Sequence, residues 1–225
     1  MNQMEKKTSP EPFGTENSEH KYVMVIDLAK CKNARKCVEK CQKTHHLPPH
    51  QELMKVYLMQ EDEEATPYWM PKPCFHCDQP LCVEACPEGA TIKRADGIVL
   101  IDTERCKGCK LCVKVCPYSS RQFNKVDSVQ VQGSKTHGQE GIMSKCDFCA
   151  DLVLEGQIPH CVVACPSGVI YFGDQLTDTV SNGTETVSFS ALIASRAGYR
   201  HLEELGTKPS VYYLPPLLAS GELHP

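Results

Sequence analysis

The fifteen cysteines of this 225-residue chain are arranged in repeated short motifs. The step C-V-x-x-C begins at Cys37, Cys82, Cys112 and Cys161, and proline follows the second cysteine in the last three copies. This spacing places two thiols about one helical turn apart on slightly different faces, and the proline ends the turn. Each copy can therefore offer its two cysteines to two different metal sites.

The thiols fall into four groups along the chain. The groups are Cys31, Cys37 and Cys41; Cys74, Cys77, Cys82 and Cys86; Cys106, Cys109, Cys112 and Cys116; and Cys146, Cys149, Cys161 and Cys165. The third group reads C-x2-C-x2-C-x3-C-P, the run with which bacterial ferredoxins hold cubane iron–sulfur clusters. In such a run three thiolates bind three corners of one cluster and the fourth ligates the neighbouring cluster. The sequence therefore predicts iron–sulfur centres.

Two other uses of cysteine agree less well with this pattern. A disulfide scaffold is typical of small secreted chains with an even number of cysteines, whereas this chain has an odd number and we expect no export signal in it. Zinc sites are often built from C-x2-C pairs, but they need neither the triple run nor the trailing proline. Both alternatives are weaker than iron–sulfur clusters.

Composition excludes several classes of function. A net charge of -4 and a pI near 6.1 provide no basic stripe for nucleic acid. The apolar stretches around 98–101 and 162–172 are shorter than the roughly 18 residues that a membrane-spanning helix needs. No nucleophile elbow, P-loop or dinucleotide-binding motif is present. We therefore expect no catalytic residues and no direct membrane span.

Several segments next to the cysteine motifs have sequence patterns typical of β-strands and of a β-hairpin. VMVIDLAKC, ending at Cys31, and GIVLIDTERC, ending at Cys106, each set an apolar strand, Asp and three residues before a cysteine, so the duplication extends beyond the thiols. Residues 90–102 alternate around Asp96-Gly97, which predicts a hairpin. Residues 168–174 predict a strand whose natural partner is 23–27.

Four further segments have local signals. Residues 50–60 predict a strand, and Trp69 in the proline-rich segment that follows either docks a partner or covers a cluster from water. Residues 124–141 predict an exposed loop. Residues 1–20 predict a flexible tail, which contains neither a twin arginine nor the apolar stretch of a signal peptide. Residues 190–205 predict a helix that ends at Gly206, with an extended arm after it.

The order of the four groups, together with the segments KCDFCADLVLEGQIPHCVVACPSGVIYFGD and HLEELGTKPSVYYLP, resembles a known family. This family comprises the four-cluster iron–sulfur beta subunits of molybdopterin oxidoreductase complexes, of the dimethyl sulfoxide, polysulfide and tetrathionate reductase type, and the resemblance covers about residues 21–216. We expect an α+β fold of two bacterial-ferredoxin-like modules, the inner one at about 74–116 inserted in the other, with loop insertions. The expected division is a tail at 1–20, a cluster-binding domain at 21–174, and a C-terminal helix and docking arm at 175–225; the alternative for the arm is that it packs on its own core.

The resemblance implies a ligand set for each cluster. The three complete sets, each expected to hold a [4Fe-4S] cluster, are Cys74, Cys77, Cys82 and Cys116; Cys86, Cys106, Cys109 and Cys112; and Cys41, Cys146, Cys149 and Cys161. The fourth set has only three members, Cys31, Cys37 and Cys165. In CKNARKC the register of the ferredoxin run puts a cysteine at position 34, where this chain has Ala34.

A missing corner ligand has three possible outcomes. The cluster can lose one iron and become [3Fe-4S], the fourth iron can be held by water or a side chain such as Asn33, or the cluster can be absent. The three remaining thiols favour a [3Fe-4S] cluster, and the iron–sulfur subunits of the quinone reductase complex of sulfate reducers and of alternative complex III resemble such a mixture. We expect this centre to differ in reduction potential from the others, because cluster type and net charge set the potential.

Other side chains near the motifs are weaker candidates. His45, His46 and His76 flank or enter the motifs, but we assign no histidine as a ligand, and we expect His76 to be a solvated or hydrogen-bonded loop residue. Lys107, Lys110 and Lys114 either raise the cluster potential or serve solubility, and surface lysines more often do the latter.

The function implied by this family is electron transfer by a non-catalytic subunit. The expected partners are a molybdopterin-type catalytic subunit and an integral-membrane quinone-interacting subunit, with a cytochrome c as a further candidate. We expect a peripheral location on the cytoplasmic membrane, with the periplasmic face, reached through a partner's export signal, slightly favoured over the cytoplasm. The alternative function is a soluble multi-cluster ferredoxin that serves a cytosolic tungsten- or formate-type oxidoreductase.

Overall fold

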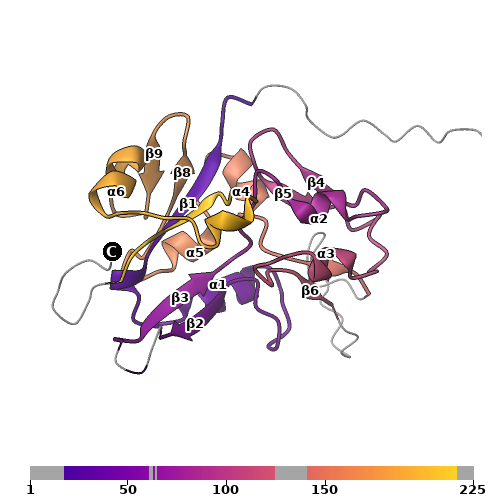
Figure 1. Cartoon of the computed structure of the whole chain (residues 1–225), viewed down its shortest axis with the longest axis horizontal. Helices are drawn as coiled ribbons and strands as arrows, with labels where there is room; N and C mark the ends of the chain where they lie inside the picture. The colour runs from indigo at the N-terminus through magenta and orange to yellow at the C-terminus, as the bar shows by residue number, and fades with distance from the viewer. Residues whose placement is uncertain (1–17, 61–62, 64, 125–140, 217–225) are drawn as a thin grey trace, which may run out of the picture.

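The computed structural model describes residues 18–60, 63, 65–124 and 141–216 (Figure 1). Most of the expected tail at 1–20 and of the expected loop at 124–141 lies outside these residues. The strands are β1 (Tyr22–Asp27), β2 (Lys55–Met59), β3 (Tyr68–Lys72), β4 (Thr91–Lys93), β5 (Val99–Ile101), β6 (Gln122–Phe123), β7 (Met143–Ser144), β8 (Ile170–Asp174), β9 (Thr179–Ser181), β10 (Thr186–Ser188) and β11 (Val211–Leu214). The helices are η1 (Leu28–Lys30), α1 (Lys36–Thr44), α2 (Leu81–Glu84), α3 (Leu111–Lys114), α4 (Ala150–Leu154), α5 (His160–Val163), α6 (Phe189–Ser195) and η2 (Glu203–Leu205).

A five-stranded sheet in the order β10-β9-β8-β1-β11 joins the two ends of the described chain. β1 is a continuous apolar run buried on both faces, as is typical of a central strand. It pairs antiparallel with β8, in a register that sets Val25 opposite Tyr171. The predicted pairing of 23–27 with 168–174 is therefore confirmed, and the first cysteine group lies beside the last.

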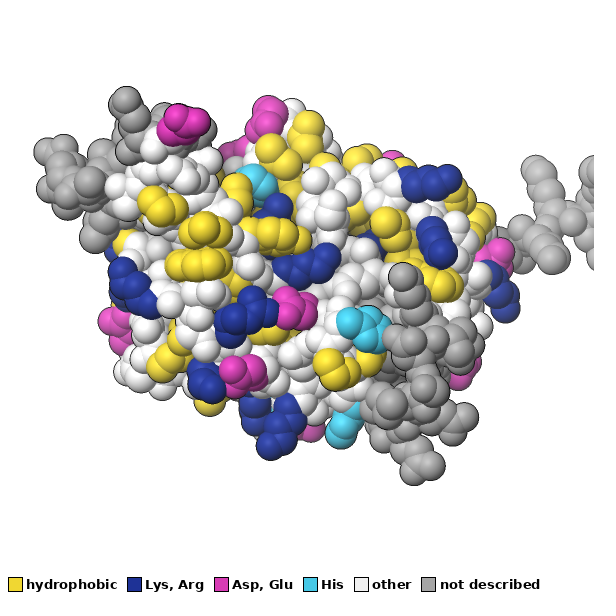
Figure 2. Space-filling view, turned by 90° about the horizontal axis from the view of Figure 1, so that it is seen from below, with side chains coloured by type: hydrophobic (Ala, Val, Ile, Leu, Met, Phe, Trp, Pro, Cys, Tyr) yellow, Lys and Arg dark blue, Asp and Glu magenta, His cyan; other side chains and the backbone are white. Residues whose placement is uncertain are grey.

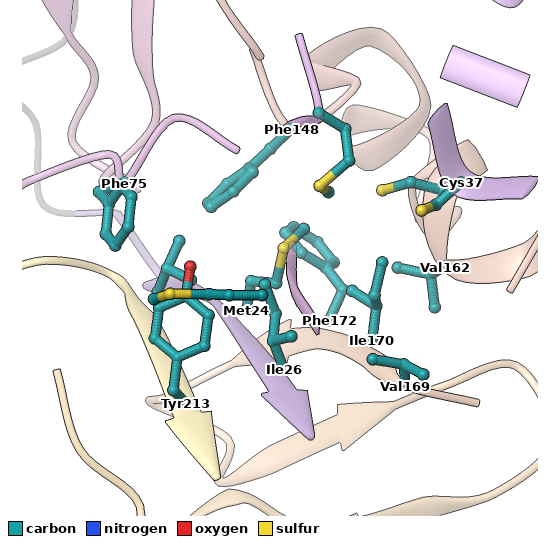
Figure 3. Close-up of a cluster of buried hydrophobic side chains, with 14 of the residues drawn as sticks. Met24, Ile26, Cys37, Phe75, Phe148, Val162, Val169, Ile170, Phe172 and Tyr213 are labelled. Carbon is teal, nitrogen blue, oxygen red and sulfur yellow. The ribbon is translucent and has the colours of Figure 1, made fainter. Parts of the chain in front are cut away.

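The two faces of the sheet bury different sets of side chains, as the alternation of a strand requires. Val23, Val25, Tyr171 and Tyr212 pack on one face with Phe189 of α6. The other face is larger and packs against the cysteine loops, and Figure 3 shows its side chains Met24, Ile26, Phe172 and Tyr213 together with the inserted rings of Phe75 and Phe148. The cysteine loops therefore pack against one face of the sheet, which supports them.

Short hairpins frame these loops. β4 and β5 pair antiparallel around Asp96-Gly97, where Gly97 has φ +90° and the amide of Arg94 donates to the carbonyl of Ile98 at 2.8 Å. The predicted hairpin over 90–102 is therefore confirmed. In Figure 1 this hairpin lies with α2 and α3 at the opposite end of the molecule from α6 and β9. β2 pairs with β3, so the strand expected within 50–60 has its partner in the segment that contains Trp69.

The helix predicted over 190–205 is shorter in the structure. α6 begins after Ser188, whose hydroxyl accepts from the amide of Ala191, and it ends at Ser195. Ala197 then takes a positive φ, and the amide of Gly198 turns back to the carbonyl of Ile193 at 2.8 Å. A Cβ on Gly198 would lie 2.7 Å from Cδ1 of Ile193, so a larger residue here would force the Ile193 side chain to shift. The helix predicted from apolar periodicity was therefore too long, because the periodicity of a segment does not reveal such a turn.

Part of the expected C-terminal arm lies in the sheet. β11 pairs in parallel with β1, and Val211, Tyr213 and Leu214 are fully buried. The hydroxyl of Tyr213 also donates to the carbonyl of Pro71 at 2.9 Å, which connects the arm to β3. Residues 211–214 therefore pack on the chain's own core.

None of the helices in the described part of the chain has both the length and the apolar character to cross a bilayer. Tyr57 and Leu58 of β2 are exposed. Figure 2 views the side on which β2 and β3 lie in Figure 1, and it shows hydrophobic side chains interspersed with lysine, arginine and acidic side chains. Trp69, opposite Leu58 in the hairpin, is only partly exposed.

Candidate metal centres

Four cysteine loops share one backbone feature. In each loop the residue before the second ligand position has a positive φ: Asn33, His76, Gly108 and Phe148, at 54°, 43°, 62° and 58°. Such a conformation is uncommon for residues other than glycine, so its fourfold occurrence indicates a common loop geometry. Ala34 thereby occupies the position that Cys77, Cys109 and Cys149 occupy in the other loops, which agrees with the sequence register.

All fifteen cysteines are free thiols in the structure. Their mutual electrostatic interactions divide them by neighbourhood. Cys37 interacts with Cys31 and Cys165; Cys161 with Cys41, Cys146, Cys149 and also Cys37; Cys77 with Cys74, Cys82 and Cys116; and Cys112 with Cys86 and Cys106. Cys109 lines one cavity with Cys86, Cys106 and Cys112. The structure therefore brings together the residues of each predicted set, while ligation itself stays a prediction.

Burial and crowding make these thiols unusual acids. Burial first, and neighbouring thiols second, raise the pKa of Cys77 to about 12, and burial also raises the pKa of Cys37 to about 11. The pKa of Cys146 and that of Cys161 are raised well above the ordinary value by the same cause. Several thiolates at this depth are costly unless a cation compensates them, and metal binding supplies that compensation while it releases the protons.

Two cavities are lined by thiols. One lies beside Cys86, Cys106, Cys109 and Cys112. The other lies beside Cys31, Cys37 and Cys165 and is also lined by Ala34 and Asn33. Val56 of β2 and Pro71 of β3 line the second cavity, so the β2–β3 hairpin helps to enclose it. A thiol-lined cavity is therefore present at the site with the missing cysteine as well as at the complete one.

Hydrogen-bond donors face the sulfur atoms. The amide of Ala90 donates to Sγ of Cys86 at 3.2 Å, and the amide of Val169 donates to Sγ of Cys165 at 3.4 Å. By contrast, Oδ1 of Asn33 is buried and has no hydrogen-bond partner among the described residues, although Asn33 lines the second cavity. Thiolate sulfurs with amide donors, and an oxygen without a partner beside an incomplete set, fit an iron–sulfur group at these positions.

Histidines have two different roles near the thiols. His76 is fully buried, and its Nδ1 accepts the amide of Val99 at 2.9 Å while its Nε2 donates to the carbonyl of Cys146 at 3.1 Å. Burial lowers its pKa well below the usual value, so it stays neutral and holds two cysteine loops together. His45 lies closer to a thiol, with Nε2 3.5 Å from Sγ of Cys149. Together with Asp147, these two residues place three potential metal-ligating atoms within 4.8 Å of one another.

Sequence reasoning missed two buried cations. Arg121 is 4% exposed, and its Nη2 donates to Sγ of Cys82 at 3.0 Å. Lys145, 2% exposed, donates to the carbonyls of Val99 and Cys146. Neither has a sequence signal that separates it from a surface residue. The lysines that the sequence did single out, Lys107, Lys110 and Lys114, are exposed instead.

These features define an iron–sulfur protein of the ferredoxin type, and residues 65–175 match the family model described as a 4Fe-4S dicluster domain. The chain is 34% identical to a selenate reductase subunit of Mesobacillus selenatarsenatis, over 88% of this chain and 73% of the relative. It is 32% identical to a tetrathionate reductase subunit of Salmonella typhimurium, over 90% and 77%. It is also 32% identical to the iron-sulfur cluster-binding subunit of menaquinone reductase from Nitratidesulfovibrio vulgaris, over 86% and 88%.

The chain therefore belongs to the family of iron–sulfur subunits of oxidoreductase complexes that these relatives represent. The family that the sequence resemblance indicated is confirmed.

Proposed function

We propose that this chain is a non-catalytic electron-transfer subunit that carries electrons through a series of iron–sulfur clusters. Its proposed partners are a molybdopterin-type catalytic subunit and a membrane subunit that reacts with quinone, with a cytochrome c as a further candidate. The observation that supports this proposal most strongly is the assembly of free thiols in loops of one shared conformation. The relatives named as subunits of reductases favour this function over a free cytosolic ferredoxin.

The proposed cofactors are three [4Fe-4S] clusters and one [3Fe-4S] cluster. The [4Fe-4S] sets are Cys74, Cys77, Cys82 and Cys116; Cys86, Cys106, Cys109 and Cys112; and Cys41, Cys146, Cys149 and Cys161. The [3Fe-4S] set is Cys31, Cys37 and Cys165, beside Ala34. The alanine in the ligand position supports the smaller cluster, and the cavity that the three remaining thiols line supports its retention.

The proposed architecture is a ferredoxin-like module at about 74–116 inserted in a second one formed by the chain ends. The pairing of β1 with β8 supports the outer module, and the β4–β5 hairpin between α2 and α3 supports the inner one. Within this division, residues 21–174 hold the clusters and residues 175–225 form the C-terminal part, in which β9, β10 and β11 belong to the sheet.

When bound, the clusters supply one-electron chemistry, and the protein supplies ligation, burial and hydrogen bonds. The thiolates would anchor the iron, and the amides of Ala90 and Val169, which donate to Sγ of Cys86 and Cys165, would stabilise negative charge on sulfur. Phe75 and Phe148 exclude water beside the loops at Cys74–Cys77 and Cys146–Cys149. Such hydrogen bonds and burial would tune the reduction potential of each cluster.

We further propose a peripheral location on the cytoplasmic membrane, on the periplasmic face, with export beside a partner that has its own signal. The support for a membrane-associated complex is the relative named as a subunit of menaquinone reductase.

Anaerobic purification of the protein from its native source under mild detergent tests the assignment as a subunit. We expect the chain to elute in an assembly several times larger than 25.0 kDa, with a second chain that carries molybdopterin. High salt serves as the control, because an assembly held by nonspecific charge contacts dissociates when such contacts are screened. A lone 25.0 kDa species that carries all the clusters contradicts the proposal.

A further inference from the structure

Arg121 places a positive charge between two predicted cluster sites. Its guanidinium donates through Nη2 to Sγ of Cys82 at 3.0 Å and through Nη1 to Oγ1 of Thr91 at 3.2 Å. Arg121 also lines the cavity of Cys86, Cys106, Cys109 and Cys112, and its charge interacts with the thiol of Cys112. Cys82 and Cys112 belong to different proposed ligand sets, and the guanidinium fork, with five N–H groups, can bond to both.

This charge has no acidic counterion in the described part of the chain. None of the ion pairs found there includes Arg121, and the negative groups that interact with it most strongly are the thiolates of Cys82, Cys74 and Cys112. An arginine side chain stays protonated in proteins, so it cannot avoid the cost of burial by losing its proton. A buried charge of this kind needs a compensating charge nearby. An anionic thiolate-bound cluster on each side would provide it.

We propose that Arg121 is the shared electrostatic partner of two neighbouring clusters and raises the reduction potential of both. The two are the cluster at Cys74, Cys77, Cys82 and Cys116 and the cluster at Cys86, Cys106, Cys109 and Cys112. This inference rests on the proposed ligand sets and adds a positioning and tuning role for a residue outside them. Reduction adds one electron, and therefore one negative charge, to a cluster. A buried cation close to the ligands of a cluster stabilises the reduced form more than the oxidised form.

Lys107 provides the matched comparison within the same site. It lines the cavity of Cys86, Cys106, Cys109 and Cys112 together with Arg121, but its side chain is exposed. Water and salt screen an exposed charge, whereas they screen a buried one much less. Burial rather than charge alone should therefore decide which residue tunes the clusters.

The test is a redox titration of the anaerobically purified complex followed by electron paramagnetic resonance, with the variants Arg121→Gln, Arg121→Lys and Lys107→Gln. We expect Arg121→Gln to lower the midpoints of two clusters by at least about a tenfold change in the reduction equilibrium, or about 59 mV for one electron. The other two midpoints should stay in place. Arg121→Lys should shift the same two clusters by less, and Lys107→Gln should leave all four unchanged.

Several results overturn the inference. They are four unchanged midpoints in Arg121→Gln with full iron content, movement of only one midpoint, or an equal shift in Lys107→Gln. If Arg121→Gln loses the iron of both clusters, Arg121→Lys decides between two roles. Retention of both clusters in Arg121→Lys supports the need for a positive charge. Loss of both clusters in Arg121→Lys as well would mean that only the shape of the arginine side chain matters, and would overturn the inference. Failure of the proposed function is distinguishable, because the unmodified complex would then lack the cluster signals themselves.

Discussion

Replacement of Ala34 by cysteine is expected to add one iron to each chain and to abolish the paramagnetic signal of the oxidised [3Fe-4S] cluster. Position 34 is where the other three loops carry their second cysteine, after a residue of positive φ. The alanine itself lines the thiol cavity with Cys31, Cys37 and Cys165. A new thiolate at this position completes a four-cysteine set, so the site should convert to [4Fe-4S].

Iron analysis and electron paramagnetic resonance of the oxidised protein measure this conversion. Lys40→Cys is the control, because it adds a thiol at an exposed position of α1 that does not line this cavity, and it should leave both the iron content and the signal unchanged. An oxidised signal that persists in Ala34→Cys at full intensity would show that the missing ligand is not what defines this cluster. A signal absent already from the unmodified protein would favour a fourth iron held by another ligand, or no cluster at this site.

Phe148→Ala is expected to cost about 3–5 kcal/mol of the free energy of unfolding, the usual range for deletion of a buried phenylalanine side chain. Phe148 is 1% exposed in the core on the cluster side of the sheet. Its ring stacks on His76, with ring centroids 3.7 Å apart, and meets Phe172 edge-on. Because His76 and Phe148 belong to two different cysteine loops, the substitution should also release iron from the clusters that these loops hold.

Phe189→Ala separates loss of stability from loss of iron. Phe189 is 6% exposed and packs on Tyr212 on the opposite face of the sheet, away from the cysteine loops. Anaerobic guanidinium unfolding of both variants, with iron determined before denaturant is added, makes the comparison. We expect both to be destabilised and only Phe148→Ala to be depleted in iron. Equal iron loss in the two variants would contradict a local role for Phe148.

Much of the fold was predictable where a local pattern determined it. Asp96-Gly97 signals a turn by itself, and the apolar runs at 23–27 and 168–174 need partners that only a sheet can supply. The cysteine spacing indicated only that the two thiols of each C-V-x-x-C step lie about one helical turn apart, whereas the grouping of thiols from different motifs was an implication of the family resemblance. The positive φ of Asn33 makes the correspondence between Ala34 and Cys109 visible in the backbone.

Other features depend on contacts between distant residues and have no local signal. From the sequence alone, Arg121 would be expected to be an ordinary exposed arginine. Only the fold places it against Cys82, which lies 39 positions away in the chain. The length of α6 depends on the close approach of Gly198 to Ile193. The placement of 211–214 as a strand depends on an open edge of β1. Periodicity within a single segment carries none of this information.

The most direct test of the account is the content of iron, acid-labile sulfide and zinc in protein purified without oxygen, combined with low-temperature electron paramagnetic resonance. Four clusters predict abundant iron with a similar amount of sulfide, negligible zinc, one signal in the oxidised state and further signals on reduction. Stoichiometric zinc without sulfide, or cysteines paired with one another as disulfides, would contradict the claim that these thiols hold iron–sulfur clusters.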